Sequence, residues 1–213
     1  MIKGLFNMVQ KICYVVGAGD FFGNKINKTV GDYVIAVDGG YQYLQKSAVE
    51  IDMVVGDFDS LKEKPVHANM VVLQKEKDDT DMLAALKIGI IKGYKRFFIY
   101  GGTGGRIAHT FANFQCLAFL SQNHAQGFLF DKHCVITAIT NKSIVFDSTH
   151  KGYISVLSHS DKAYGVTIKN LKYELDNITV LSTYPIGVSN QFIGKDSIIS
   201  VEDGTLIVIY EQM

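Results

Sequence analysis

The chain has 213 residues, of which 47% are hydrophobic and 20% are charged, a composition typical of a globular protein with enough apolar material for a core. Lysine plus arginine equals aspartate plus glutamate at 21 each, which excludes a generally basic nucleic-acid-binding surface. No apolar run approaches the roughly 18 residues of a transmembrane helix, and the short stretch 12–17 is interpreted as a first strand, not a signal peptide.

Short apolar runs alternate with helical stretches along the first 130 or so residues. Helices are predicted over 41–48, 80–92 and 106–121. Strands are predicted over 12–17, 33–37, 52–56, 70–73 and 96–100. This alternation indicates an N-terminal α/β domain with a mostly parallel sheet.

From Cys134 onward the pattern contains short strands only. They are predicted over 134–139, 143–146, 153–157, 165–169, 178–181, 197–201 and 205–210. Seven strands without a helix indicate a small all-β antiparallel sandwich or barrel. We therefore expect an α/β catalytic domain over residues 1–133 and a β domain over residues 134–213.

The three cysteines, Cys13, Cys116 and Cys134, are far apart and form no CxxC pair. Each lies among apolar residues, which favours buried free thiols over a metal role. Unpaired thiols suit a reducing compartment, so a cytoplasmic location is expected.

Aspartates are concentrated in one part of the chain: seven of the 15 lie between Asp38 and Asp81. Several follow apolar strands, which suggests oxygen ligands for a hard cation. Asp57 and Asp59 would share a face if the strand before them continued through both. Gly, Asp and Ser are also turn-forming residues, and an Asp-x-Asp after a strand occurs in haloacid-dehalogenase-type phosphatases and nucleotide-sugar glycosyltransferases as well.

Three of these seven aspartates, Asp78, Asp79 and Asp81, lie at the start of the predicted helix 80–92. Thr and Asp are common N-cap residues, and this accounts for one or two of these positions. Asp78 and Asp81 are three residues apart and can face one site, with Asp81 the better candidate for metal contact, directly or through water.

Four glycines and an arginine lie between a predicted strand and a predicted helix, at 101–106. Glycines allow backbone N–H groups to approach an anion, the following helix N-terminus adds a positive end, and Arg106 can bind a phosphate with two hydrogen bonds. A tight structural turn would need fewer glycines. The loop is not a Walker A motif, and the segment 17–23 misses a Rossmann fingerprint by one glycine, so a nicotinamide cofactor is weakly supported.

Two further polar sites remain open from spacing alone. His109, in the helix after the glycine loop, is equally compatible with ligand contact and with a structural role. Ser189 and Asn190 could hydrogen-bond a polar heterocycle, although a hairpin turn explains them better.

Taken together, these motifs resemble those of the thiamine pyrophosphokinase family in order and spacing, and the match covers nearly the whole chain. The motifs are Asp38-Gly39-Gly40, Gly56-Asp57-Phe58-Asp59-Ser60, Lys77-Asp78-x-Thr80-Asp81, Gly101-Gly102-x-Gly104-Gly105-Arg106 and Gly187-x-Ser189-Asn190. The resemblance implies transfer of a pyrophosphoryl group from ATP to the hydroxyl of thiamine, giving thiamine diphosphate and AMP with Mg²⁺. It also implies a homodimer with sites formed between chains, and no nucleic-acid or membrane partner is expected.

The resemblance also implies roles for individual residues. The expected metal ligands are Asp57, Asp59 and Asp81, which together with Arg106 form the expected catalytic set. The expected ATP- and phosphate-binding residues are Asp38, Gly39, Asp78, Gly101, Gly102, Gly104, Gly105 and Arg106. The expected thiamine contacts are His109, Ser189 and Asn190, the last two in the β domain.

The chain departs from the family pattern at Ala108, where the family usually has an aspartate. Two alternatives to the implied activity are a nucleotide-binding protein with a decayed catalytic site and a sugar-nucleotide transferase that uses the Asp-x-Asp. The retained carboxylates argue against the first alternative, and the second would not need the glycine loop with Arg106.

Overall fold

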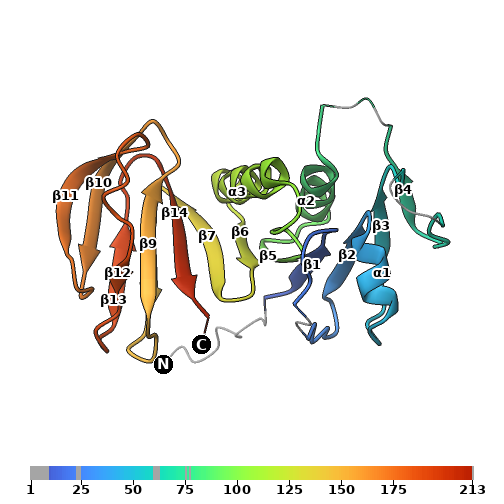
Figure 1. Ribbon diagram of the computed structural model, residues 1–213, viewed down its shortest axis with the longest axis horizontal. Coiled ribbons are helices and arrows are strands. Elements are labelled where there is room, and N and C mark those ends of the chain that lie inside the picture. Colours follow the sequence, from blue (N-terminus) through green and yellow to red (C-terminus); the bar gives the residue numbers. More distant parts are fainter. Residues whose placement is uncertain (1–9, 23–24, 60–62, 75, 77, 213) are drawn as a thin grey trace, which may run out of the picture.

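The first six strands form a parallel sheet. The computed structural model describes residues 10–22, 25–59, 63–74, 76 and 78–212. The strands lie side by side in the order β4-β3-β2-β1-β5-β6 (Figure 1). Their bounds are β1 Ile12–Val16, β2 Tyr33–Val37, β3 Met53–Gly56, β4 Met70–Val72, β5 Arg96–Tyr100 and β6 Gln126–Phe130. Because parallel strands end at the same edge, the loops after β1, β2, β3 and β5 meet there.

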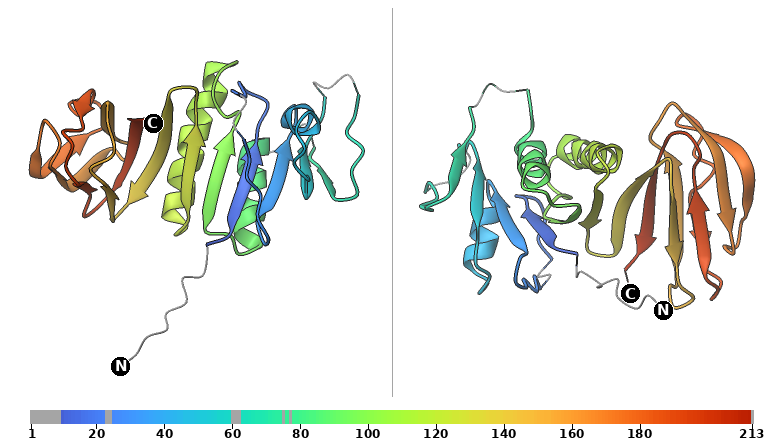
Figure 2. Two further views of the ribbon diagram at one scale, coloured as in Figure 1. Left: turned by 90° about the horizontal axis from the view of Figure 1, so that it is seen from below. Right: turned by 180° about the vertical axis from the view of Figure 1, so that it is seen from behind.

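Helices cover both faces of this parallel sheet (Figure 2). The two longer helices, α2 (Asp81–Ile91) and α3 (Ile107–Gln122), lie over one face, and the short α1 (Gly40–Gln45) lies on the other. Cys13 and Val15 of β1 pack toward α2 and α3, whereas Tyr14 and Val16 pack on the side of α1. This burial on both faces explains why the strands are continuous apolar runs in the sequence.

The same sheet continues into the C-terminal part with antiparallel strands. β7 (Cys134–Thr140) pairs with β6, and β14 (Thr205–Glu211), β9 (Tyr153–Ser158) and β12 (Asn190–Gln191) follow, which makes ten strands in all. A second, antiparallel sheet contains β11 (Leu175–Leu181), β10 (Lys162–Lys169), β13 (Ser197–Ser200) and β8 (Ser143–Phe146). A buried cluster with members from both sheets, such as Ile168 of β10 and Val208 of β14, holds them face to face.

The predicted fold class is confirmed, but two strands were not predicted. β6 contains only five residues and begins with Gln126-Gly127, so its apolar part is too short to stand out. β12 has two residues and exists only through its pairing with β9. The strand predicted over 165–169 begins earlier, at Lys162. Gly165 has φ +63 and lies beside a register shift, so it is an irregularity inside β10 and not the start of the strand.

The predicted boundary between residues 133 and 134 falls between two paired strands. Phe128 and Phe130 of β6 lie opposite Thr137 and Val135 of β7. The two predicted domains therefore share one sheet, and their division into 1–133 and 134–213 stays a prediction.

Candidate functional site

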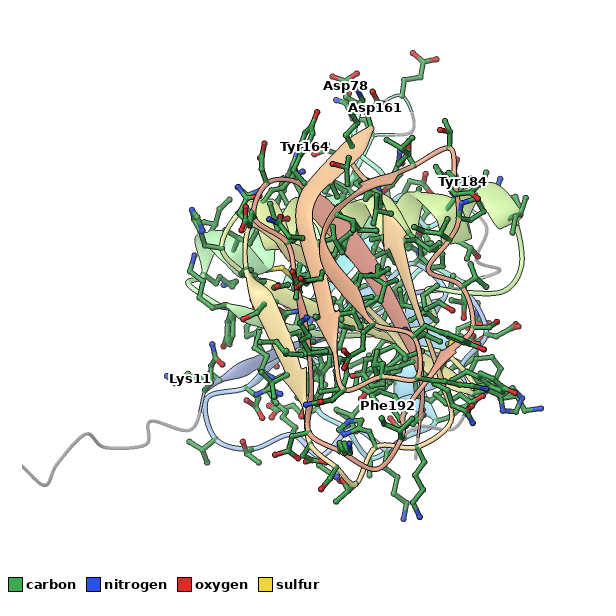
Figure 3. All side chains as sticks on the ribbon, turned by 90° about the vertical axis from the view of Figure 1, so that its left-hand side faces the viewer. Lys11, Asp78, Asp161, Tyr164, Tyr184 and Phe192 are labelled. Carbon is green, nitrogen blue, oxygen red and sulfur yellow. The ribbon has the colours of Figure 1, made fainter. Side chains whose placement is uncertain are left out.

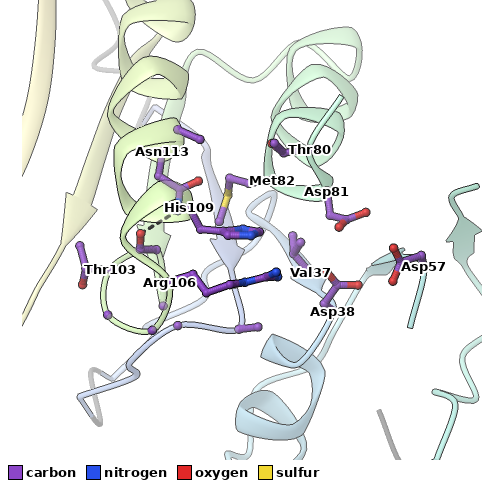
Figure 4. Close-up of a pocket in the computed structure, with 18 of the residues that line it drawn as sticks. Val37, Asp38, Asp57, Thr80, Asp81, Met82, Thr103, Arg106, His109 and Asn113 are labelled. Carbon is purple, nitrogen blue, oxygen red and sulfur yellow. Dashed lines mark hydrogen bonds between the residues drawn. The ribbon is translucent and has the colours of Figure 1, made fainter. Parts of the chain in front are cut away.

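A cavity of about 770 Å³ lies at the edge where β1, β2, β3 and β5 end (Figure 4). The loops after these four strands and the first turns of α2 and α3 form its walls. Its lining residues are Gly17, Ala18, Gly19, Val37, Asp38, Asp57, Asp59, Thr80, Asp81, Met82, Gly101, Gly102, Thr103, Gly104, Gly105, Arg106, His109, Ala112 and Asn113. Ten of the residues predicted from the sequence are among them.

One wall of the cavity carries carboxylates from three separate elements. Asp38 follows β2, Asp57 follows β3, and Asp81 is the first residue of α2. Figure 4 shows their side chains on the same side of the cavity, facing Arg106 and His109. Residues up to 43 positions apart in the sequence are thus brought together by the shared edge of the sheet.

Asp38 has the most perturbed carboxyl group of this wall. Burial, a hydrogen bond with Asp81 and the charges of Asp81 and Asp57 raise the pKa of Asp38 to about 7, and only the backbone N–H of Phe58 opposes them. Its Oδ1 is buried and has no hydrogen-bond partner in the described part of the chain. A Cβ added at Gly56 would lie 2.0 Å from this oxygen, so the approach requires glycine. Asp38 is therefore held where a proton or a cation would stabilise it.

The strand does not continue through Asp57 and Asp59, so they do not share a strand face and the alternative of a turn is confirmed. β3 ends at Gly56, and Phe58 adopts a left-handed conformation with φ +57 while its ring is buried at 2% exposure. The segment turns instead, and the backbone N–H of Asp59 donates to Asp57 Oδ1 at 3.1 Å. Both residues still line the cavity, Asp57 half-buried and Asp59 exposed.

The opposite wall is the glycine loop between β5 and α3. Gly101, Gly104 and Gly105 have φ values of +60, +78 and +60, which disfavour residues with a Cβ. A Cβ at Gly102 would lie 2.6 Å from Leu129 Cδ1. All four glycines thus have a structural reason, so the expectation that a tight turn would need fewer glycines is wrong.

Arg106 and His109 extend from the end of this loop toward the carboxylate wall (Figure 4). Arg106 is the N-cap residue of α3, and both side chains are exposed within the cavity. Ala108 is also exposed but does not line the cavity. The aspartate expected at this position from the family pattern would therefore project from a residue that is not part of the cavity lining.

Four predicted site residues do not line the cavity. Gly39 is the N-cap of α1, and Asp78 is exposed before α2 begins. The side chain of the adjacent Asp79 pairs with Lys87 at 2.7 Å instead.

The other two, Ser189 and Asn190, belong to the β part. Residues 186–189 form a turn in which Ser189 has φ +60, but the predicted hairpin is wrong, because β11 before the turn and β12 after it lie in different sheets. The side chain of Asn190 is 5% exposed, and both ends of its amide bond the backbone of Tyr173, at 3.0 and 2.7 Å. Neither residue contacts the cavity of its own chain, and their roles stay predictions.

Sequence reasoning missed several lining residues. Gly17 and Gly19 donate backbone hydrogen bonds of 2.8 Å to Tyr100 O and Gly101 O, so the segment after β1 lies along the glycine loop. The Gly17-Ala18-Gly19 pattern is the sequence signal for this close approach of two backbone segments. Asn113 lies four residues after His109, a spacing that places it on the same face of α3 and could have identified it. The remaining residues missed are Ala18, Val37, Thr80, Met82, Thr103 and Ala112.

Within the described ranges, no group of three His, Cys, Asp or Glu side chains is close enough to hold a metal ion without further ligands. Cys13 and Cys116 are buried free thiols, as predicted, whereas the free thiol Cys134 is only half-buried, and burial raises the pKa of Cys13 to about 12. Any cation in this cavity would therefore need oxygen ligands from its substrate or from water in addition to the carboxylates.

Among the helices of the described residues, none has the length and hydropathy needed to cross a bilayer.

Known proteins are similar to this chain in both sequence and fold. The model of the thiamin pyrophosphokinase catalytic domain matches residues 26–129, and the model of the vitamin B1 binding domain of thiamin pyrophosphokinase matches residues 137–206. A thiamine pyrophosphokinase of Bacillus subtilis (strain 168) is 29% identical over 182 residues, which are 82% of this chain and 85% of the relative.

Solved structures agree with these matches. The crystal structure of thiamine pyrophosphokinase from Bacillus subtilis has a TM-score of 0.82 at 28% identity and covers 95% of this chain and 99% of its own. A thiamin pyrophosphokinase family protein from Enterococcus faecalis has a TM-score of 0.81 at 26% identity, covering 95% and 100%. Yeast thiamin pyrophosphokinase, at 16% identity and a TM-score of 0.72, shares the fold over 96% of this chain and 87% of its own. The resemblance found in the motifs is confirmed, and the chain belongs to the thiamin pyrophosphokinase family.

Proposed function

We propose that this chain transfers the pyrophosphoryl group of ATP to the hydroxyl of thiamine, yielding thiamine diphosphate and AMP. The observation that carries the proposal is the cavity, in which a carboxylate wall faces a glycine loop with Arg106 in a chain that has both domains of the family. Such a site suits a reaction in which a triphosphate must be neutralised and aligned.

The glycine loop and Arg106 are proposed to bind the phosphates. The guanidinium of Arg106 can donate two parallel hydrogen bonds to phosphate oxygens. α3 begins directly after it and has no acidic residue in its first turn, so the positive end of the helix is not neutralised from within.

The carboxylate wall fits a magnesium ion that is bound together with a nucleotide. Mg²⁺ commonly takes one or two protein carboxylates and completes its shell with water and phosphate oxygens. Asp57, Asp59 and Asp81 are the proposed carboxylates, one or two of them bound to the ion directly and the others through water, and the unpaired Oδ1 of Asp38 adds an acceptor at the same wall. The ion would supply charge neutralisation at the phosphate oxygens.

The proposed reaction is an in-line displacement at the β-phosphorus of ATP. The hydroxyl oxygen of thiamine forms a bond to the β-phosphorus, and the bond from this phosphorus to the α–β bridging oxygen breaks, so AMP leaves. A carboxylate of the wall accepts the hydroxyl proton, while Arg106 and the loop N–H groups hold the phosphate oxygens.

We also propose that two copies of the chain share each thiamine site. Ser189 and Asn190 do not line the cavity of their own chain, so their predicted contact with thiamine needs a second copy. Nearby, Tyr184, Ile186 and Val188 are 64%, 43% and 52% exposed, and Figure 3 shows Tyr184 at the surface. In the proposed homodimer this turn lies against the partner's glycine loop, and a monomeric mass by light scattering at working concentration would refute it.

Product analysis tests the proposed reaction. Purified protein is incubated with ATP, Mg²⁺ and thiamine, and nucleotides are separated by chromatography, with parallel samples that lack thiamine or contain a chelator. AMP in amounts equal to thiamine diphosphate is expected only in the complete mixture. ADP would indicate an ordinary kinase, and the absence of turnover would indicate a decayed site. The cytoplasmic location expected from the free thiols stays a prediction.

A further inference from the structure

The carbonyl groups of the glycine loop are held by donors from outside the loop. Gly101 O accepts from Gly19 N at 2.8 Å, and Thr103 O accepts from Asp20 N at 2.8 Å. Gly102 O accepts from Asn113 Nδ2 at 2.7 Å (Figure 4). Gly104 O contacts Thr110 Oγ1 at 3.4 Å. Four consecutive carbonyls are thus engaged by backbone or side-chain donors.

The N–H groups of the same loop show the opposite pattern. Within the described ranges, no backbone N–H from residue 102 to residue 106 donates a hydrogen bond to another protein group. A peptide carbonyl repels a phosphate oxygen, whereas a peptide N–H attracts it. Because the carbonyls of this loop are already hydrogen-bonded, the groups that it has left to offer are N–H donors, which suit an anion.

Asn113 differs from the other donors because it is a side chain of α3 that lines the cavity itself. It is 8% exposed, so its amide is largely shielded from water that could replace it. A Cβ at Gly102 would lie 3.3 Å from Asn113 Nδ2, which shows how closely the amide approaches the loop. Without this donor the Gly102 carbonyl would be left unpaired in a confined place, and rotation of its peptide toward the cavity would relieve the loss.

We propose that Asn113 is a positioning residue for pyrophosphate binding: its amide fixes the Gly102 peptide so that the glycine loop presents donors to the phosphates. This inference rests on the proposed binding of ATP at the loop, and it adds a residue that acts through the loop and not on the reacting atoms. It predicts that Asn113 affects the affinity for phosphate-containing ligands and leaves the affinity for thiamine unchanged.

The test compares two variants with a matched control. Asn113→Asp keeps the shape of the side chain but replaces the donor by a carboxylate, and Asn113→Ala removes the amide without adding charge. Asn123→Asp is the control, because the Asn123 amide also donates to a carbonyl, Phe119 O at 2.8 Å, at the exposed far end of the same helix. Binding of inorganic pyrophosphate with Mg²⁺ is measured by calorimetry, and KM for ATP and for thiamine by AMP release.

Both Asn113 variants are expected to bind pyrophosphate at least about tenfold more weakly than the wild type and to raise KM for ATP by a similar factor. KM for thiamine is expected to stay within about twofold, and Asn123→Asp to match the wild type in every binding measurement. Wild-type pyrophosphate affinity in a folded Asn113→Ala variant would overturn the inference, as would equal rises in both KM values.

The calorimetric measurement separates this inference from the proposed activity. A wild-type protein that releases no AMP but binds pyrophosphate in an Asn113-dependent manner would refute the proposed reaction and support the positioning role. A wild-type protein that releases AMP and whose Asn113 variants bind pyrophosphate normally would do the reverse.

Discussion

The substitution Ala108→Asp restores the aspartate that the family usually has and separates two possible roles for it. The N-cap residue of α3, Arg106, makes no side-chain cap, and the first turn of the helix contains no acid. An aspartate there would interact with the helix dipole and with Arg106, whereas position 108 does not line the cavity. We therefore expect an effect on stability and not a gain in catalysis.

The stabilisation due to the charge is the difference between Ala108→Asp and Ala108→Asn, because asparagine has nearly the same shape as aspartate but no charge. A carboxylate in the first turn of an exposed helix contributes about 0.3–1 kcal/mol at low ionic strength. In a chain of this length each kcal/mol shifts Tm by about 2–4 °C, so the aspartate variant should melt about 1–4 °C above the asparagine variant. The difference should shrink in 1 M salt, where the Debye length is only about 3 Å.

Thermal melts at two salt concentrations and rates of AMP release test this reasoning together. Turnover of both variants is expected to stay within about tenfold of the wild type, because a catalytic general base is worth about 10²–10⁴-fold and none is missing from the cavity by this account. A rise of two orders of magnitude or more in Ala108→Asp alone would show that the wild-type chain lacks a catalytic carboxylate.

Other changes give further tests. Asp57→Asn and Asp59→Asn should each lower AMP release by about 100-fold or more with little change in Tm, since both line the cavity outside the core; near-normal Mg²⁺-dependent release by either would remove that residue from the proposed metal site. Between pH 3.8 and about 7, the folded metal-free protein keeps a proton on Asp38 that the unfolded chain has released, so its free energy of unfolding should fall as pH rises. Asp38→Asn should remove this loss of stability, which is about 1–2 kcal/mol once solvent screening is allowed for. If denaturant melts show that the variant still loses the same free energy of unfolding between pH 3.8 and about 7, the prediction is contradicted. Gly89→Ala should destabilise the protein by about 1–3 kcal/mol although alanine favours helices, because its Cβ would lie 2.4 Å from the Phe97 ring; an unchanged midpoint in urea would show that the ring moves aside.

Most of the predicted site residues that line the cavity come directly after strands buried on both faces. Such strands are visible as apolar runs, and whatever follows them is delivered to one edge of a parallel sheet. Asp38, Asp57 and the glycine loop could therefore be placed together before the structure was known. The family resemblance implied their grouping in one site, and the shared edge of the parallel sheet is its physical reason.

The parts that were not predicted depend on contacts between residues distant in sequence or on the residue at which a helix begins. Asp78 lies outside the cavity because the cap falls at Thr80, where the side chain accepts from Leu83 N, and the helix begins one residue later. The Asn190 amide bonds the backbone of Tyr173, 17 residues away, and no pattern around position 190 indicates this. Asn113 is important through a single carbonyl whose orientation only the folded loop determines.

The place of β14 in the ten-stranded sheet has a consequence for synthesis on the ribosome. This strand is made after every other described strand, yet it lies between β7 and β9, with hydrogen-bonded partners on both sides. Until residue 211 has left the exit tunnel, both neighbours present unpaired edges that can join a strand of another chain. The parallel half has no such delay, because all of its strands are complete by residue 130. A nascent chain can thus form its cavity early, while its β part stays prone to aggregation until β14 inserts. A chain terminated before residue 205 lacks β14, so the edges of β7 and β9 stay unpaired.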